Sequence, residues 1–238
     1  MTYSKALFFP AARHLALAVL ASAALLSCSK KETDTVAPAG TMPATADATT
    51  AVGCPYIPAG TKAPGTNWDC GCSDYGPNSE LAHNKQAYTA AGANHYFITS
   101  ASIEVDNMNP NHYAYGDHKS GWSFNAGVTK QNWQMIVSSG YGGWHGQYGY
   151  GNQYYGPGYD MIHDRALDVR VYEQNVNHHG GIDRYLAGHR NGQTGLNNPN
   201  TADIRMFQAS WHWIHDQLNS NQAHYRDGVR FWVNIPPI

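Results

Sequence analysis

The stretch from Thr201 to Leu218 constrains the fold more than any other part of this chain, because it is the clearest amphipathic helix in the sequence. Thr201 is a natural N-cap shortly after Pro199. Apolar side chains then recur at steps of three and four residues, as one buried helix face requires: Ile204, Phe207, Trp211, Ile214 and Leu218. The sequence therefore predicts one long helix near its C-terminus.

Shorter segments carry weaker signals for secondary structure. Residues 80–91 are expected to form a short helix. Alternating apolar residues or a short buried apolar run predict strands at residues 95–105, 132–138, 167–172 and 228–235. The last of these strands ends at a pair of prolines. In the third strand, the carboxylate of Asp168 is expected to point away from the face of Leu167.

Loops fill the intervals between these elements. Residues 54–78 and 106–121 are rich in turn-forming or polar residues, and residues 140–158 are rich in glycine. The order of strand, glycine-rich loop, strand, helix and strand predicts an α+β fold. We expect a small antiparallel sheet, one long amphipathic helix and extended glycine-rich loops.

The N-terminus has the layout of a secretory signal. Lys5 and Arg13 precede an apolar run from Leu15 to Leu26, which is too short to span a membrane. The run ends in Leu25-Leu26-Ser27-Cys28, which resembles the bacterial lipobox. That resemblance implies that Cys28 becomes the lipid-modified first residue of the mature protein. We expect a protein of the bacterial cell envelope, periplasmic or at the cell surface, that contacts the membrane through its lipid anchor only.

The domain organisation follows from composition. Residues 1–27 are the predicted lipoprotein signal peptide. Residues 28–51 carry almost no large apolar side chains and are expected to form a disordered tether, because they cannot bury enough surface to offset chain entropy. Residues 52–238 remain for a single globular domain of ordinary size.

Charge and aromatic content narrow the possible partners. The formal net charge is −2 and 13% of residues are charged, so a nucleic-acid partner is not expected. The 24 glycines, 16 tyrosines and 7 tryptophans give a neutral, aromatic and turn-rich chain. That composition is common in exported proteins that handle sugars or cell-wall polymers.

Three cysteines follow the predicted signal peptide and its lipid-modified residue. An oxidising compartment favours a disulfide from Cys54 to either Cys70 or Cys72, which leaves one thiol over. Cys70 and Cys72 are too close in sequence for an easy bond to each other. We therefore expect a disulfide near the start of the globular domain.

A cluster of imidazole and carboxylate side chains lies next to the glycine-rich segment. His163 and Asp164 are the candidate catalytic residues, since a cluster of this kind can hold a metal or polarise water. A zinc site needs about three His or Asp/Glu ligands and a free position for water. The chain offers His163, Asp168 and His212 in that order.

That order resembles the zinc D-alanyl-D-alanine carboxypeptidases, whose fold is shared with the hedgehog signalling domain. The resemblance rests on Ser139-Gly140-Tyr141, on His163 with Arg165-Ala166-Leu167-Asp168-Val169-Arg170, and on Trp211-His212. It implies a zinc-dependent peptidase that acts on cell-wall peptide. The chain departs from the family pattern at Gly142, where an arginine is expected, and at Ala209, where the catalytic glutamate is expected. The general base is therefore unassigned, with Asp164 and Asp216 as substitutes.

A second resemblance is to secreted phospholipase A2. It rests on the loop Tyr141-Gly142-Gly143-Trp144-His145-Gly146 and on the pair His163-Asp164. It implies a calcium-dependent ester hydrolase with a lipid substrate, in which His163 is the base and Asp164 is a calcium ligand. Asp203 could orient the imidazole.

A third possibility is a non-catalytic surface lipoprotein that binds a glycan through Trp122, Trp144 and tyrosines. Tyr141 and Trp144 are the candidate substrate-binding residues. The preferred prediction is an exported zinc-dependent hydrolase. Calcium is the alternative cofactor, and the expected substrate is a cell-wall peptide, a glycan or a lipid.

Overall fold

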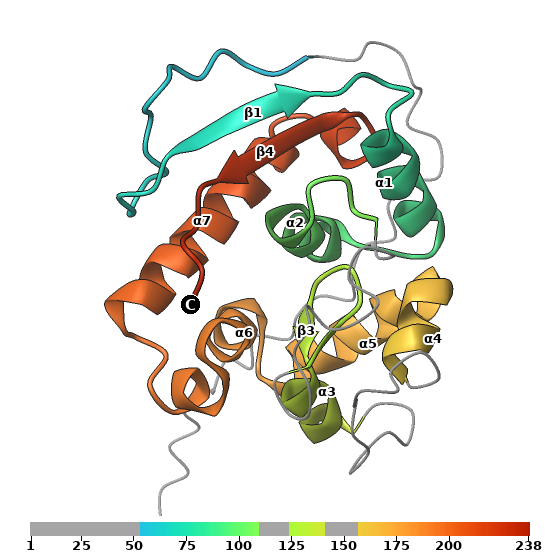
Figure 1. Cartoon of the computed structure of the whole chain (residues 1–238), viewed down its shortest axis with the longest axis vertical. Helices are drawn as coiled ribbons and strands as arrows, with labels where there is room; N and C mark the ends of the chain where they lie inside the picture. Colours follow the sequence, from blue (N-terminus) through green and yellow to red (C-terminus); the bar gives the residue numbers. More distant parts are fainter. Residues whose placement is uncertain (1–52, 110–123, 141–156) are drawn as a thin grey trace, which may run out of the picture. The chain divides into compact units, whose positions relative to one another are not determined.

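The computed structural model describes residues 53–109, 124–140 and 157–238 (Figure 1). The α-helices of this part are α1 (Glu80–Ala90), α2 (His95–Glu104), α3 (Trp133–Ser139), α4 (Pro157–His163), α5 (Arg165–His178), α6 (Ile182–Asn197) and α7 (Ala202–Asn219), followed by the 3-10 helix η6 (Gln222–Tyr225). The strands are β1 (Cys70–Asp74), β2 (Asn125–Ala126), β3 (Gln131–Asn132) and β4 (Val229–Val233). This is the α+β fold that the sequence predicted.

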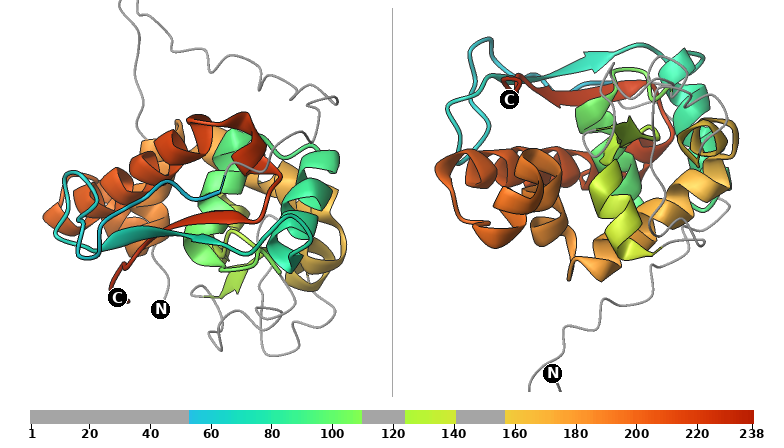
Figure 2. Two further views of the ribbon diagram at one scale, coloured as in Figure 1. Left: turned by 90° about the horizontal axis from the view of Figure 1, so that it is seen from above. Right: turned by 60° about the horizontal axis from the view of Figure 1, so that its bottom comes forward.

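The strands form two small antiparallel pairs. The first and last strands of the described chain, β1 and β4, pair in the register Cys70↔Val233 to Asp74↔Val229. Strand β4 packs on α7 and α2, and both views of Figure 2 show the pair β1–β4 running alongside α7. The second pair, β2–β3, is a short hairpin.

Helix α7 confirms the strongest sequence prediction. Thr201 is its N-cap, with a side chain that accepts a hydrogen bond from the backbone N–H of Ile204 at 3.4 Å. The apolar positions predicted to face the core are all buried: Ile204, Phe207, Trp211, Ile214 and Leu218. Helix α1 and strand β4 also match their predicted segments, within a few residues at each end.

A buried chain of hydrogen bonds joins α7, α2 and α5. The indole Nε1 of Trp211 donates to Ser100 Oγ at 2.8 Å. Ser100 Oγ lies 2.8 Å from the hydroxyl of Tyr172 on α5, and that hydroxyl also donates to the carbonyl of Tyr96 at 3.2 Å. Helix α2 is therefore held from both sides by specific contacts as well as by apolar packing.

Residues 95–104 form a helix, so the predicted strand there was wrong. Asn94 caps this helix by accepting a hydrogen bond from the N–H of Phe97 at 2.9 Å. Thr99 and Ser102, polar residues in a buried helix, donate their hydroxyls to carbonyls one turn back, at 2.8 Å each. Their polar groups are thus satisfied inside the helix.

The strands predicted at residues 132–138 and 167–172 are also helical. Asn132 caps α3, and the left-handed Gly140, with φ 69°, ends it. Asp164 caps α5 by accepting from the N–H of Leu167 at 3.0 Å. Because α5 is a helix, Asp168 lies on its buried face while Leu167 is half-buried, which reverses the orientation expected for a strand. In both cases a polar N-cap begins a helix where an apolar run or apolar alternation predicts a strand.

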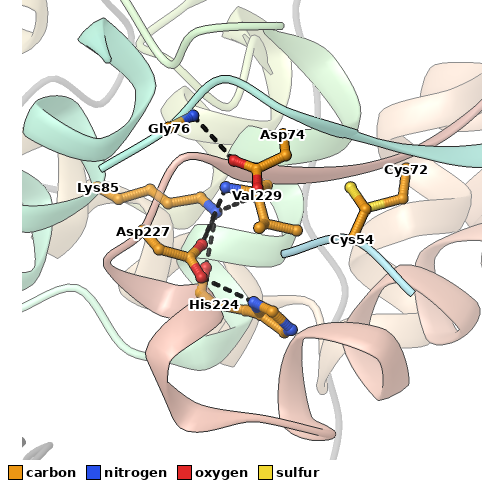
Figure 3. Close-up of a disulfide and its surroundings, with 8 residues drawn as sticks. All are labelled: Cys54, Cys72, Asp74, Gly76, Lys85, His224, Asp227 and Val229. Atoms are coloured by element: carbon orange, nitrogen blue, oxygen red, sulfur yellow. Dashed lines mark hydrogen bonds and ion pairs between the residues drawn. A yellow bond between two sulfur atoms is a disulfide. The ribbon is translucent and has the colours of Figure 1, made fainter. Parts of the chain in front are cut away.

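The disulfide joins Cys54 to Cys72, one of the two pairings that the sequence allowed. Cys70, the other candidate, is a free and buried thiol. Figure 3 shows the bond between the chain entering the domain and strand β1. None of the described helices is both long and apolar enough to cross a membrane.

Lys85 of α1 is a fully buried cation beside this strand pair (Figure 3). Its Nζ donates to the carbonyl oxygens of His224, at 2.6 Å, and Val229, and it lies 3.8 Å from Asp227 Oδ1. Desolvation lowers the pKa of Lys85 to about 8, although the charge of Asp227 opposes that effect. The hydrogen bonds of Lys85 therefore join α1 to η6 and β4, but removing its charge from water costs free energy.

Lys85 gives the stability a specific pH dependence. Between about pH 8 and 10 the unfolded chain, with a lysine pKa near 10.4, binds more protons at this position than the folded chain. Lys85 should therefore contribute a rise on the order of 2 kcal/mol to the free energy of unfolding across this window. Urea denaturation at several pH values measures the total slope, which also contains opposite contributions from the buried thiol of Cys70 and the buried tyrosines, and Lys85→Met should lower that slope by the lysine's contribution.

Lys62→Met is the matched control, because Lys62 pairs with Asp69 at an exposed position. Its slope should equal that of the unmodified protein. At pH 7, Lys85→Met should lose about 2 to 3 kcal/mol, since two buried carbonyls lose their donor. Equal slopes in all three proteins would contradict the assignment.

Candidate active site

The predicted catalytic residues lie at a helix junction. His163 is the exposed last residue of α4, where its ring stacks on Tyr159 and its Nδ1 lies 2.8 Å from the Tyr159 carbonyl oxygen. Asp164 is the N-cap of α5 and lies 3.9 Å from Arg170. Both residues therefore have local contacts within the described structure, and their catalytic roles stay predictions.

The three proposed zinc ligands have different surroundings. Asp168 is fully buried under the β2–β3 hairpin, whereas His212 is exposed on α7 and hydrogen-bonds Asp183 at 2.7 Å. Within residues 53–109, 124–140 and 157–238 there is no group of three or more His, Cys, Asp or Glu side chains that could hold a metal ion. The prediction of a zinc site formed by His163, Asp168 and His212 was therefore wrong.

Asp203 does not orient His163 as the phospholipase resemblance implied. Its two carboxylate oxygens each accept a hydrogen bond from the guanidinium of Arg190, at 2.9 Å. Tyr141 and Trp144, the predicted substrate-binding residues, lie outside the described residues, as do Trp122 and Cys28. Zinc or calcium as a cofactor stays a prediction.

Glu104, which no pattern in the sequence singled out, has the features of a functional carboxylate. It is the last residue of α2, and its side chain is 17% exposed. Oε1 lies 3.0 Å from His189 Nε2 on α6. The side chain is thus largely desolvated while still reaching the surface. Because residues 95–105 were predicted to form a strand, Glu104 was not recognised as the last residue of a helix.

Stacked rings hold the histidine partner in place. His189 lies between Tyr185 and Phe207, with ring centroids 5.9 Å and 5.8 Å away and interplanar angles of 22° and 19°. The next residue, Arg190, joins Asp203 and also donates to the carbonyl of Pro236 at 3.0 Å. These contacts fix α6 against α7 and the C-terminal segment just before a kink at Gly192, where φ is 56°. The imidazole therefore reaches Glu104 from a rigid support.

Charges around Glu104 set its protonation. Burial alone would raise the pKa of Glu104, but the charge and hydrogen bond of His189, together with the charges of Lys130 and Arg190, lower it below its usual value. Glu104 is therefore a carboxylate at neutral pH in the free protein. A desolvated carboxylate of this kind can accept a proton from water or stabilise developing positive charge.

The comparisons with known proteins identify a family. The model of glycosyl hydrolase family 134 matches residues 82–235, which is more than half of the chain and runs from α1 through β4. No curated protein matches the chain. The family match overturns the resemblance to zinc D-alanyl-D-alanine carboxypeptidases and the alternative of a phospholipase. The expectation of a hydrolase agrees with this family. The expectation of a zinc-dependent peptidase that acts on cell-wall peptide was wrong. Of the predicted substrates, a glycan fits the family.

The ion pair of Glu104 predicts a specific titration. In His189→Gln the charge of the imidazole is lost, so the pKa of Glu104 should rise toward the value that burial favours. Carbon-13 NMR of the side-chain carboxyl groups, followed as a function of pH, measures this shift. His212→Gln is the control, because His212 pairs with Asp183 on the exposed side of α7. An unchanged Glu104 titration in His189→Gln would refute the pairing.

Proposed function

Because this chain belongs to glycosyl hydrolase family 134, we propose that it hydrolyses glycosidic bonds in a glycan and that Glu104 supplies one of the reacting carboxyl groups. The family match is the observation that carries this proposal. Glycoside hydrolysis generally uses two carboxyl groups that flank the scissile bond, around a transition state with oxocarbenium character. The proposal therefore requires a carboxyl group that is partly desolvated yet able to reach a substrate.

Glu104 meets this requirement better than the buried or paired acids of the described chain. Asp168 is fully buried, so a polymer could not reach it. Asp203 is taken up by the bidentate pair with Arg190, and Asp227 by His224 and the backbone of Val229. Glu104 hydrogen-bonds an imidazole through Oε1, and its side chain is 17% exposed.

The ionised state of Glu104 limits its first step. As a carboxylate, Glu104 can take a proton from an attacking water, or it can approach the anomeric carbon as positive charge develops there. The groups that lower its pKa are all basic, so they do not provide the second carboxyl group. We therefore assign one member of the pair and leave its partner unassigned.

Location is a separate part of the proposal. The charged N-terminal flank, the short apolar run and the lipobox-like Leu25-Leu26-Ser27-Cys28 support export and lipid attachment at Cys28. Contact with the membrane would then pass through the lipid alone. The low net charge supports a partner other than nucleic acid.

Loss of the Glu104 carboxylate tests the catalytic assignment. Glu104→Gln keeps the shape of the side chain but removes its ability to take a proton, so kcat should fall by about 10²- to 10⁴-fold. The assay measures the release of reducing ends from a panel of soluble plant and bacterial polysaccharides. Binding of the same polysaccharides should persist in the variant.

Glu173→Gln is the matched control for this assay. Glu173 is also a half-buried glutamate, and it accepts a hydrogen bond from Asn94 at the opposite end of α2, at 3.2 Å. Its replacement should leave kcat within about twofold of the unmodified protein, since it lies outside the proposed site. Full activity in Glu104→Gln would refute the role of Glu104, and binding without any release of reducing ends by the unmodified protein would refute hydrolysis.

The lipid anchor has its own test. In a bacterial host that processes lipoproteins, the unmodified protein should partition with the membrane fraction and incorporate radiolabelled palmitate. Cys28→Ser should lose both the label and the membrane association. Cys70→Ser is the control, because Cys70 is a buried thiol inside the domain. Equal labelling of unmodified protein and Cys28→Ser would refute the proposal.

A further inference from the structure

The β2–β3 hairpin (Asn125–Asn132) turns sharply against α5. The turn contains two residues in left-handed conformations, Gly127 with φ 73° and Lys130 with φ 46°. Strand pairing is limited to Asn125↔Asn132 and Ala126↔Gln131. Because an isolated two-stranded hairpin of this length is marginal in water, contacts outside the hairpin must fix its position.

Asp168 of α5 supplies the polar contact with the start of the turn. Its Oδ2 accepts a hydrogen bond from the N–H of Val128 at 3.0 Å and one from the hydroxyl of Tyr88 at 3.3 Å. A Cβ atom on Gly127 would lie 2.2 Å from Asp168 Oδ1, so the hairpin backbone can approach the carboxylate only because residue 127 is glycine. Further along the hairpin, Asn175 Nδ2 donates to Gln131 Oε1 at 3.1 Å. Helix α5 thus holds the turn at two points.

The burial of Asp168 costs stability. The residue is 0% exposed, and its Oδ1 has no hydrogen-bond partner within the described residues. Desolvation raises the pKa of Asp168 to about 7, even though the hydrogen bonds from Val128 and Tyr88 act in the opposite direction. An apolar residue would fill such a site at lower cost. The benefit of the Asp168 carboxylate therefore lies in the position that it gives the hairpin.

Electrostatic and packing contacts connect the turn with the site around Glu104. The charge of Lys130 is one of those that keep Glu104 ionised. The hairpin contacts α6. Thr129, the residue before Lys130, interacts with Tyr185, which stacks on His189. The hairpin therefore links a buried acid on α5 to the half-buried acid at the end of α2.

We propose that Asp168 is a positioning residue that clamps the β2–β3 hairpin onto α5 and so holds Lys130 within electrostatic reach of Glu104. This inference rests on the proposed function for its effect on catalysis, but the clamp itself does not. Asp168 touches no substrate in this account. It acts through the N–H of Val128 and the close approach at Gly127.

The experiment is a double-mutant cycle between Asp168 and Lys130, read by the carboxyl titration of Glu104. In the unmodified protein, Lys130→Met should raise the pKa of Glu104 by about half a pH unit, because a cation that favours the carboxylate is lost. Asp168→Ala should raise it by a similar amount, and adding Lys130→Met to Asp168→Ala should change it by less than half of that. Lys62→Met, remote in sequence and paired with Asp69, is the control and should leave Glu104 unchanged.

Asp168→Asn separates the clamp from the charge of Asp168. Asparagine keeps an acceptor for the N–H of Val128, so the full effect of Lys130→Met should return in this variant. Amide hydrogen exchange of Val128 should be slow in Asp168→Asn and faster in Asp168→Ala. If Asp168→Ala does not fold, Gly127→Ala provides the same perturbation from the hairpin side, since its Cβ would press on Asp168.

Two results would overturn the clamp. Independent, additive effects of Asp168→Ala and Lys130→Met on Glu104 would show that Asp168 does not position Lys130. Loss of the Lys130 effect in Asp168→Asn would show that a hydrogen-bond acceptor at residue 168 is not what holds the hairpin in place. Both readouts are independent of turnover, whereas full activity of Glu104→Gln would remove the proposed function and leave the clamp to be judged by the titration alone.

Discussion

The buried hydrogen-bond chain from Trp211 through Ser100 to Tyr172 is the contact on which the candidate site depends. It connects α7 and α5 to the middle of α2, so a shift of α2 along its axis would break bonds on both sides. Glu104 is the last residue of α2 and inherits that fixed position. His189 meets it from α6, where two aromatic rings restrict the imidazole. The geometry of the pair is thus set by packing at a distance, in agreement with the general need for rigid support of catalytic groups.

The sequence predicted elements well where apolar period and capping agreed, as in α7, but poorly where they conflicted. Residues 95–105, 132–138 and 167–172 carry alternating apolar residues or a short apolar run, which predict strands, whereas the capping residues Asn94, Asn132 and Asp164 lie at or just before their starts. Those three residues are N-caps in the structure. Propensity is a weak guide in buried helices, where tertiary packing decides.

The wrong strand assignment of residues 95–105 also concealed the candidate site, and so did the large sequence distances between its residues. Glu104 attracts notice only as the end of a helix, and its partners Lys130 and His189 are far away in sequence, so no local spacing connects them. The members of the histidine-aspartate motif at 163–164 are adjacent in sequence, so this motif is visible without knowledge of the fold. Short motifs of this kind occur by chance in a chain with thirteen histidines. The class of enzyme, by contrast, follows from the match of a family model to residues 82–235 and not from any short motif.

The thiol of Cys70 bears on the permanence of the disulfide next to it. Cys70 is two positions from Cys72 on the same strand, close enough in sequence to compete for Cys54 during oxidative folding. Burial, aided by the charge of Asp69, raises the pKa of the Cys70 thiol. Exchange requires a thiolate that can reach a sulfur atom. Once β1 has paired with β4, the unpaired sulfur is protonated and enclosed, so folding itself protects the chosen linkage from being reshuffled.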